Sequence, residues 1–177
     1  VVSQKIPNLA LNRPTTILGY PNRLHTPSNA NDGDIDSYWD GGTTYPNWWQ
    51  VDLGAIYDLN SIHVVNYYKD TRYYQYEIQG SLDDINWFTV KDFSGNTNIS
   101  TSFGNTFDID KTARYLRVNM LYNSVNGREH IVEFEAYGTL SSVVSPNLAL
   151  NKPTKGFGGR TVLSQRANDG DKSIGNY

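Results

Sequence analysis

Apolar and polar residues alternate in short runs along most of the first 138 residues. The clearest run is WWQVDLG at residues 48–54, which has the period of a half-buried strand. Similar runs, separated by turn residues about every ten positions, predict strands at residues 61–68, 73–81, 87–91, 106–109, 113–121 and 131–137. No convincing amphipathic helix is present. The pattern predicts an all-β fold, a β-sandwich or jelly roll with loops clustered at its two ends.

Two short motifs occur twice. NLALNRP at residues 8–14 returns as NLALNKP at 147–153, and ANDGD at residues 30–34 returns at 167–171. Two landmarks repeated at nearly one spacing indicate an internal repeat. The predicted organisation is a lead-in at residues 1–7, one complete module at 8–138, a linker at 139–146 and the N-terminal part of a second copy at 147–177.

The composition narrows the choice of partners. The net charge is −3, which gives no basic surface for nucleic acid and disfavours anionic membranes. The 13 Tyr and 4 Trp residues are a large aromatic share, and such side chains serve binding surfaces as well as cores. There is no Cys, so the fold needs no disulfide.

An oxygen-rich turn precedes the first long strand. Asp32, Asp34 and Asp36 lie two residues apart, with Gly33 between the first two. Glycine permits a turn with positive φ, and closely spaced oxygens suit a hard cation. The alternative is a turn without an ion, in which the carboxylates accept hydrogen bonds from backbone N–H groups.

Seven motifs in order carry a family resemblance. They are NLALNRP, NANDGD, SYW, WWQVDLG, YYQYEIQGSLDDINW, ARYLRV and VEFEAYG, which are spread in this order over residues 8–138. This segment resembles a discoidin or coagulation-factor type C domain, and most closely its bacterial branch, the family 32 carbohydrate-binding modules. The resemblance implies a discoidin-like β-sandwich that binds carbohydrate without catalysis.

The resemblance also implies a structural calcium ion that ties the acidic turn to the last strand. Carried over to this sequence, the side chains of Asp32 and Ser37 and the carbonyls of Asn29 and Asp34 bind it. The last strand adds the Glu133 carboxylate and the Val132 carbonyl.

The implied sugar site differs from the galactose-binding pattern. Members that bind galactose have a His after the aromatic pair, where this chain has Asp40. Proteins meet sugars with aromatic faces and fixed polar groups. The candidates of these types are Asp40, Tyr45, Trp48, Tyr67, Tyr68, Lys69, Arg72, Tyr73, Asn123 and Arg128.

Other aromatic and polar residues near these candidates, and Arg72 among the candidates, have a purely structural interpretation. Trp39 and Trp49 are expected in the core, as are Tyr74, Tyr76 and Ile78, which share one strand face. Arg72 could form a plain surface ion pair with Asp70. His25 is a loop residue that could reach the edge of the site.

The sequence therefore predicts a non-catalytic module that targets a secreted glycan-active protein to polysaccharide or glycan. Galactose-type glycans are the first expectation and glucans the second. Protein or phospholipid adhesion is the alternative. No nucleophile, zinc or phosphate-loop motif is present, so catalysis by this chain is not expected.

Overall fold

The computed structural model describes residues 7–19, 22–42 and 47–143. They all lie in the first of two units into which the chain divides, Val1–Val144 and Ser145–Tyr177. The predicted second copy at 147–177 and the end of the predicted linker fall outside the described residues. Among the described residues, no helix is both long and apolar enough to cross a membrane.

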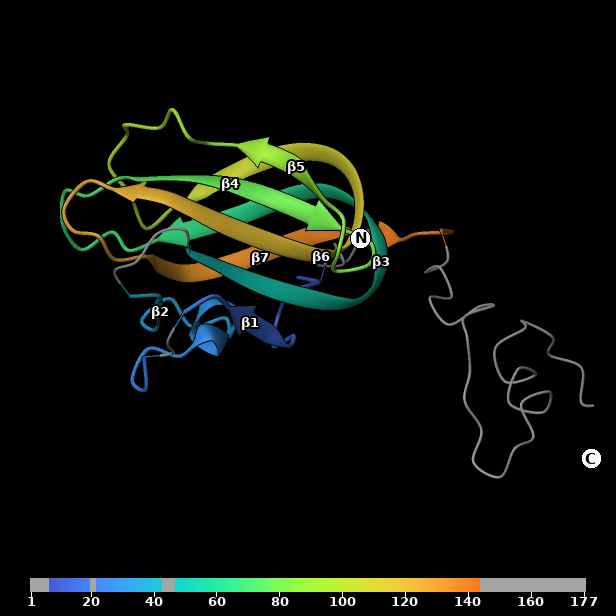
Figure 1. The fold of residues 1–177 in the computed structure, drawn as a ribbon, viewed down its shortest axis with the longest axis horizontal. Coiled ribbons are helices and arrows are strands. Elements are labelled where there is room, and N and C mark those ends of the chain that lie inside the picture. The colour runs from blue at the N-terminus through green and yellow to red at the C-terminus, as the bar shows by residue number, and fades with distance from the viewer. Residues whose placement is uncertain (1–6, 20–21, 43–46, 144–177) are drawn as a thin grey trace, which may run out of the picture. The chain divides into compact units, whose positions relative to one another are not determined.

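The regular secondary structure of the described chain is almost entirely β-strand (Figure 1). The strands are β1 (Thr15–Ile17), β2 (Trp39–Asp40), β3 (Asn47–Asn66), β4 (Tyr74–Ser81), β5 (Trp87–Asp92), β6 (Asn105–Asn123) and β7 (His130–Leu140). One turn of 3₁₀ helix, η1 (Pro27–Ala30), precedes the acidic turn. The all-β prediction is confirmed.

All strand pairs are antiparallel, in the order β2-β7-β3-β6-β4-β5, with β1 on the free side of β3. β3 and β6 are long and strongly bent, as Figure 1 shows. Their pairing register shifts between Asp52 and Tyr57, where both strands pass from one layer of the sandwich to the other. The sequence pattern predicted two shorter strands in place of each of these long ones, because the residues at the bend interrupt the alternation of apolar and polar positions.

The core lies between the two layers. Trp39, Trp49, Tyr74, Tyr76 and Ile78 are at most 1% exposed, which confirms their predicted place in the core. Trp49 packs against Phe134 of β7 with 5.1 Å between ring centroids. Burial of these large rings is the main favourable contribution to folding.

The loops that carry most of the predicted sugar residues gather at one end of the sandwich, called here the loop end. It is formed by residues 66–74, which connect β3 to β4, and by residues 123–130, which connect β6 to β7. The start of β7 pairs with β2, so residues 39–42 lie at the same end. β7 then runs away from the loop end and finishes at Leu140, which pairs with Tyr57 beside the bend of β3.

Candidate functional site

His130 is the centre of a polar cluster at the loop end. Tyr74 donates its hydroxyl proton to His130 Nδ1 at 2.8 Å, and Arg72 Nη1 donates to the same nitrogen at 3.1 Å. Because both neighbours are donors, Nδ1 is the unprotonated nitrogen and the ring proton lies on Nε2. Nε2 lies 3.9 Å from Asp40 Oδ1. The cluster therefore joins β2, the 66–74 loop, β4 and the start of β7.

Burial keeps the His130 ring neutral. The ring is 6% exposed, and loss of water lowers its pKa to about 4. Asp40 favours the charged ring, whereas Arg72 and Arg128 oppose it. At neutral pH the site thus holds a fixed N–H donor at Nε2 and no added positive charge.

Arg72 is held on several sides. Its Nε and Nη2 donate to both carboxylate oxygens of Asp70, with a shortest distance of 2.6 Å. Its guanidinium carbon lies 4.7 Å from the centre of the Tyr67 ring. Only 7% of Arg72 is exposed, so the pair with Asp70 is not the plain surface ion pair considered from the sequence. The bidentate pairing raises the pKa of Arg72 and lowers that of Asp70.

Asp40 is the acceptor of the cluster. Its Oδ2 accepts hydrogen bonds from Arg128 Nη1 at 2.6 Å and from Asn22 Nδ2 at 3.1 Å. The Asp40 side chain is 5% exposed, whereas that of Arg128 is 45% exposed. Arg128 therefore leaves part of its guanidinium open to a ligand while the carboxylate beneath holds it in place.

Aromatic rings border this polar cluster. Tyr38 makes an edge contact with Tyr67 at 5.3 Å and stacks on His25 at 4.0 Å, measured between ring centroids. All three rings are half-buried, so each keeps part of its surface in solvent. The sequence left open whether His25 reaches this region, and its stacking on Tyr38 places it at the border of the polar cluster.

Glu129 lies next to the cluster and has no counter-charge. It is 1% exposed, and neither carboxylate oxygen has a hydrogen-bond partner among the described residues. Burial, followed by repulsion from Asp40, raises the pKa of Glu129 to about 9. A Cβ at Gly41 would meet Glu129 Oε2 at 2.9 Å, so glycine is needed for this packing.

The structure brings four of the predicted sugar residues together around His130: Asp40, Tyr67, Arg72 and Arg128. Tyr68 and Lys69 lie on the same loop, and Lys69 Nζ is 4.0 Å from Asp36. Asn123 stabilises the 123–130 loop internally, because its Nδ2 donates a hydrogen bond to the Arg128 carbonyl at 2.6 Å. Tyr73 contacts Tyr122 instead of the His130 cluster.

Trp48 lies elsewhere. Trp49 points into the core, so the strand period turns Trp48 to the opposite face of β3, where it packs on Arg117. It is therefore separated from the other predicted sugar residues, which gather around His130. Tyr45 falls outside the described residues.

Neither Tyr38 nor Glu129 is among the sugar-binding residues predicted from the sequence, and His130 is a polar candidate of the 123–130 loop that the final set leaves out. His130 was visible in the YNSVNGREH loop and Tyr38 in the SYW motif. No sequence signal showed that the two-residue strand β2 pairs with the start of β7, and this pairing is what sets Asp40 opposite His130.

The acidic turn gathers a second group of oxygen atoms. Ser37 Oγ donates to Asp32 Oδ2 at 2.8 Å and lies 3.1 Å from the Asn29 carbonyl. The carbonyl of Asp34 accepts from Ser37 N at 3.2 Å, which turns it inward as well. Gly33 adopts φ +82° at the tip, a conformation that glycine takes without strain.

The last strand approaches this turn. Glu133 Oε2 accepts from Gly33 N at 2.9 Å, while Oε1 is buried without a partner among the described residues. Burial, with repulsion from Asp32, Glu135 and Asp34, raises the pKa of Glu133 to about 8. Val132 is an extra residue in β7 between the pairs Val65–Glu133 and Asn66–Ile131, so a bulge removes it from the regular pairing.

These residues fit the oxygen set that a hard cation needs. Within the described ranges, no three His, Cys, Asp or Glu side chains group as metal ligands. The candidate site depends instead on two carboxylates, one hydroxyl and backbone carbonyls, a mixture that calcium accepts. An unpartnered buried carboxylate oxygen beside acidic neighbours is a position that a cation would stabilise.

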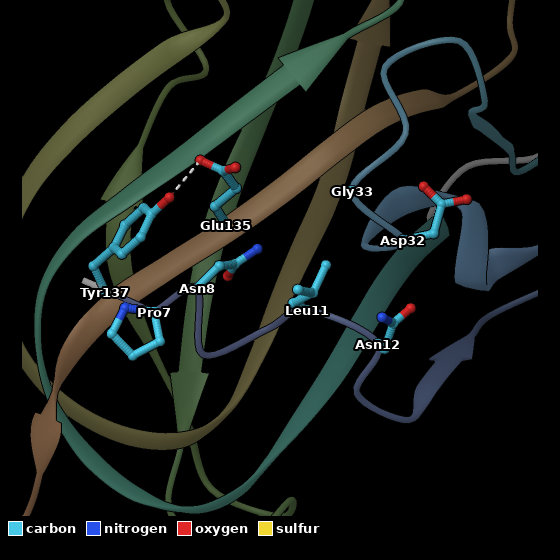
Figure 2. Close-up of a pocket in the computed structure, with 8 residues that line it drawn as sticks. All are labelled: Pro7, Asn8, Leu11, Asn12, Asp32, Gly33, Glu135 and Tyr137. Atoms are coloured by element: carbon cyan, nitrogen blue, oxygen red, sulfur yellow. Dashed lines mark hydrogen bonds between the residues drawn. The ribbon is translucent and has the colours of Figure 1, made fainter. Parts of the chain in front are cut away.

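A pocket of about 530 Å³ borders the acidic turn. Figure 2 shows its lining: Pro7, Asn8, Leu11, Asn12, Asp32, Gly33, Glu135 and Tyr137. Tyr137 donates its hydroxyl to Glu135 at 2.8 Å across one wall. None of the predicted sugar residues lines it, so this pocket is separate from the His130 cluster.

The sequence profile of the F5/8 type C domain matches residues 18–134, and the chain belongs to this family. The family resemblance drawn from the seven motifs is thereby confirmed. The family 32 module (CBM32) of AlyQ, solved with 4,5-unsaturated mannuronic acid, is 24% identical with a TM-score of 0.58, which shows the shared fold. The match covers 70% of this chain and 93% of that one.

Two further solved structures are more similar. A family 89 glycoside hydrolase from Clostridium perfringens, in complex with 2-acetamido-1,2-dideoxynojirmycin, is 31% identical with a TM-score of 0.70, covering 84% of this chain and 16% of that one. Chitosan-binding module 2 of a chitosanase/glucanase from Paenibacillus sp. IK-5, in complex with chitotriose, is 26% identical with a TM-score of 0.62. That match covers 74% of this chain and 100% of the module.

A match to a curated protein is partial. BTB/POZ domain-containing protein 9 of Homo sapiens is 31% identical over 90 residues, which is 51% of this chain and 14% of that protein. The chain thus spans a small part of the curated relatives it matches and of the family 89 enzyme. The similarity concerns only that part of those proteins.

Proposed function

We propose that this chain is a non-catalytic carbohydrate-binding module whose glycan site is the His130 cluster at the loop end. The observation that carries the proposal is the convergence of fixed donors and one acceptor there. His130 Nε2, Arg72 and Arg128 supply N–H groups, and Asp40 supplies a carboxylate. Beside the rings of Tyr67 and Tyr38, this set suits adjacent hydroxyls and the C–H face of one sugar.

Similar proteins support a glycan ligand. The Paenibacillus module was solved with chitotriose, and its whole length corresponds to this chain. That solved structure is a binding module. The match to the family 89 enzyme, in contrast, covers only 16% of the enzyme chain. This favours an accessory role in a larger secreted, glycan-active protein over catalysis by the chain itself.

The sugar class follows the order set by the sequence, with galactose-type glycans first and glucans second. Asp40 stands where galactose-binding members have His, which changes a donor into an acceptor. Asp40 and Arg128 together can bind two neighbouring hydroxyls, one as donor and one as acceptor. Single-site affinity is expected to be weak, because an open, wet site gains little from each contact.

A bound calcium ion is part of the same proposal. Asp32, Ser37 and Glu133, with the carbonyls of Asn29, Asp34 and Val132, would hold it. The ion would join the acidic turn to β7 next to the first residues of that strand. Its role would be structural, since it would hold η1 and β2 against β7 and so keep Asp40 in place.

Calorimetry of the protein against soluble galactans, glucans and chitooligosaccharides tests the site. Asp40→Ala and Arg128→Ala are expected to weaken binding about ten-fold or more, since each removes a charge-assisted contact. Arg13→Ala is the control, because it removes an exposed arginine that lies outside the cluster. Binding that both cluster variants retain in full would place the glycan elsewhere, and no binding by the intact protein would refute the proposal.

One observation favours the alternative of protein or phospholipid adhesion. Three apolar side chains project from the loops at this end: Leu24 is 83% exposed, Phe103 86% and Val125 53%. Such residues can insert into a lipid surface or a protein groove. Co-sedimentation with phosphatidylserine vesicles separates the cases, since lipid binding would be lost in Leu24→Ser/Phe103→Ser and unaffected by free sugar.

A further inference from the structure

The outer face of the sheet carries an aromatic ladder that the loop-end site does not use. Arg117 of β6 pairs in register with Gln50 of β3 and with Gln79 of β4. Trp48 lies two residues before Gln50, and Trp87 pairs with Ser81, two residues after Gln79. The two tryptophans therefore lie on diagonally opposite sides of Arg117, on the face that points away from the core.

Both indole rings stack on the Arg117 guanidinium. Its carbon lies 4.5 Å from the ring centre of Trp48 and 3.7 Å from that of Trp87. Both rings are half-buried, so each keeps surface in solvent.

Arg117 has few partners of its own. Its Nη2 donates to Gln50 Oε1 at a long 3.4 Å, and its buried Nε has no partner among the described residues. Desolvation lowers the pKa of Arg117 and outweighs the opposite effect of the Asp84 carboxylate. Among the described residues, no carboxylate forms an ion pair with Arg117. The guanidinium is therefore positioned by stacking, with N–H groups left over for a ligand.

The surroundings select against an anionic ligand. Asp84 accepts from Gln50 Nε2 at 2.8 Å, and Glu77 accepts from Gln79 Nε2 at 3.3 Å, which places two carboxylates next to the glutamines that flank Arg117. The nearby Asp52 is already paired with Arg114 at 2.8 Å. A sulfate or uronate at Arg117 would meet these carboxylates, whereas neutral hydroxyls can use both donors and acceptors.

We infer that the Trp48–Arg117–Trp87 ladder is a second carbohydrate site, for the interior of a neutral glycan chain. Pyranose rings lie on the two indoles, and their hydroxyls accept from Arg117. The surface belongs to a sheet rather than to a loop pocket, so it suits a chain that runs past it. This site is independent of the His130 cluster, and either can exist without the other.

Tryptophan fluorescence distinguishes a sugar bound at this ladder from a sugar bound at the His130 cluster. The chain has 4 Trp residues, and Trp39 and Trp49 are 0% exposed in the core. A sugar at the ladder shields Trp48 and Trp87 from acrylamide, whereas a sugar at the His130 cluster touches no exposed indole. We expect cellohexaose, laminarihexaose or galactohexaose to reduce acrylamide quenching in a saturable way, in both the native protein and Asp40→Ala.

Variants on β5 and β6 test the ladder residues, with a control on β5. Trp87→Ala and Arg117→Lys should each weaken the protection about ten-fold, the first by removing a stacking face and the second by removing the planar fork. Phe88→Ala is the control, because the adjacent aromatic on β5 points to the opposite face, toward Gly80. Arg117→Lys keeps the charge and the aliphatic stem, so it tests the site even if Trp87→Ala unfolds.

Three results would overturn the inference. One is the absence of protection by any of the three hexasaccharides. Another is protection that Arg117→Lys retains in full. The third is shielding that appears without sugar and grows with protein concentration, which would assign the ladder to contact between copies of this chain.

Discussion

Asp40 and His130 face each other as register partners of β2 and β7, with 3.9 Å between Asp40 Oδ1 and His130 Nε2. A histidine beside a carboxylate would usually be expected to gain a proton, yet this ring stays neutral. Burial, together with Arg72 and Arg128, outweighs the opposite effect of the Asp40 and Asp70 carboxylates on the pKa of His130.

The first prediction concerns the pH dependence of this pair. The folded-state pKa of His130 is about 4, below the unfolded value of about 6.5, so its contribution to stability is complete above pH 6.5. It is lost as pH falls toward 4, because the unfolded chain binds the proton first. Ring-proton NMR should show His130 titrating near pH 4, and a midpoint above 6 would contradict this account.

The second prediction separates Arg72 from its neighbour Tyr73. Arg72→Ala leaves Asp70 without its partner and opens the support beneath Tyr67, so we expect glycan binding to be lost. The free energy of unfolding should fall by about 2–4 kcal/mol. Tyr73→Ala should change affinity less than about two-fold, since its ring contacts Tyr122.

Calorimetry and chemical denaturation of the two variants measure both effects. Equal loss of binding in the two variants would move the site toward Tyr73 and away from His130.

The third prediction concerns the loss of folding stability through Glu129 as the pH rises. The folded pKa of Glu129 is about 9, above the unfolded value of about 4.3, so its contribution is complete below pH 4.3. It is lost progressively as pH rises toward 9, by at most about 1.4 kcal/mol per pH unit. Glu129→Gln stays neutral and should flatten this decline.

Urea denaturation between pH 5 and 9 provides the measurement, with Asp108→Asn as the control because that carboxylate is exposed. Parallel pH profiles for the native protein and Glu129→Gln would show that Glu129 is not a buried neutral acid.

The fourth prediction is that calcium stabilises the module. At 100 times its dissociation constant, a ligand specific for the native state adds about 2.7 kcal/mol, which raises the melting temperature by several degrees. Asp32→Asn and Glu133→Gln should each abolish the rise. Differential scanning calorimetry with calcium and with a chelator measures this rise in melting temperature. Identical melting curves under the two conditions would remove the ion from the proposal.

The fifth prediction tests the β3–β7 ladder. A Cβ at Gly138 would clash with the Asp58 carbonyl and meet Leu59 Cα at 2.9 Å, both on the backbone of the neighbouring strand. Gly138→Ala should therefore cost roughly 2–4 kcal/mol in unfolding free energy. Gly95→Ala meets no atom within 4 Å and should change stability by less than about 1 kcal/mol.

The alternation of residues predicted the fold well, because each strand has one buried face. Trp49, Val51 and Leu53 are all buried, as the WWQVDLG run requires. The same rule placed Tyr74, Tyr76 and Ile78 correctly. It failed where β3 and β6 bend, since a residue at the bend leaves the regular pairing and interrupts the period.

The site was less predictable, because it is assembled across the sheet. Asp40 meets Arg128 over 88 residues of chain, through a pairing of only two residues between β2 and β7. Trp48 shows the opposite difficulty: it was grouped with the residues of the loop site, yet the strand period turns it to the outer face of β3, beside Arg117. Local pattern identified the residue types, and only the register shows which of them meet.

The course of β7 has a consequence for any domain joined to this one. The chain enters beside Ala136, where Leu9 N donates to the Ala136 carbonyl at 2.8 Å, and the last strand runs from the loop end to Leu140. A domain joined after Leu140 would be attached at the end of the module opposite the loop end, where the His130 cluster lies. The connection to such a domain therefore leaves the glycan-facing end of this module unobstructed.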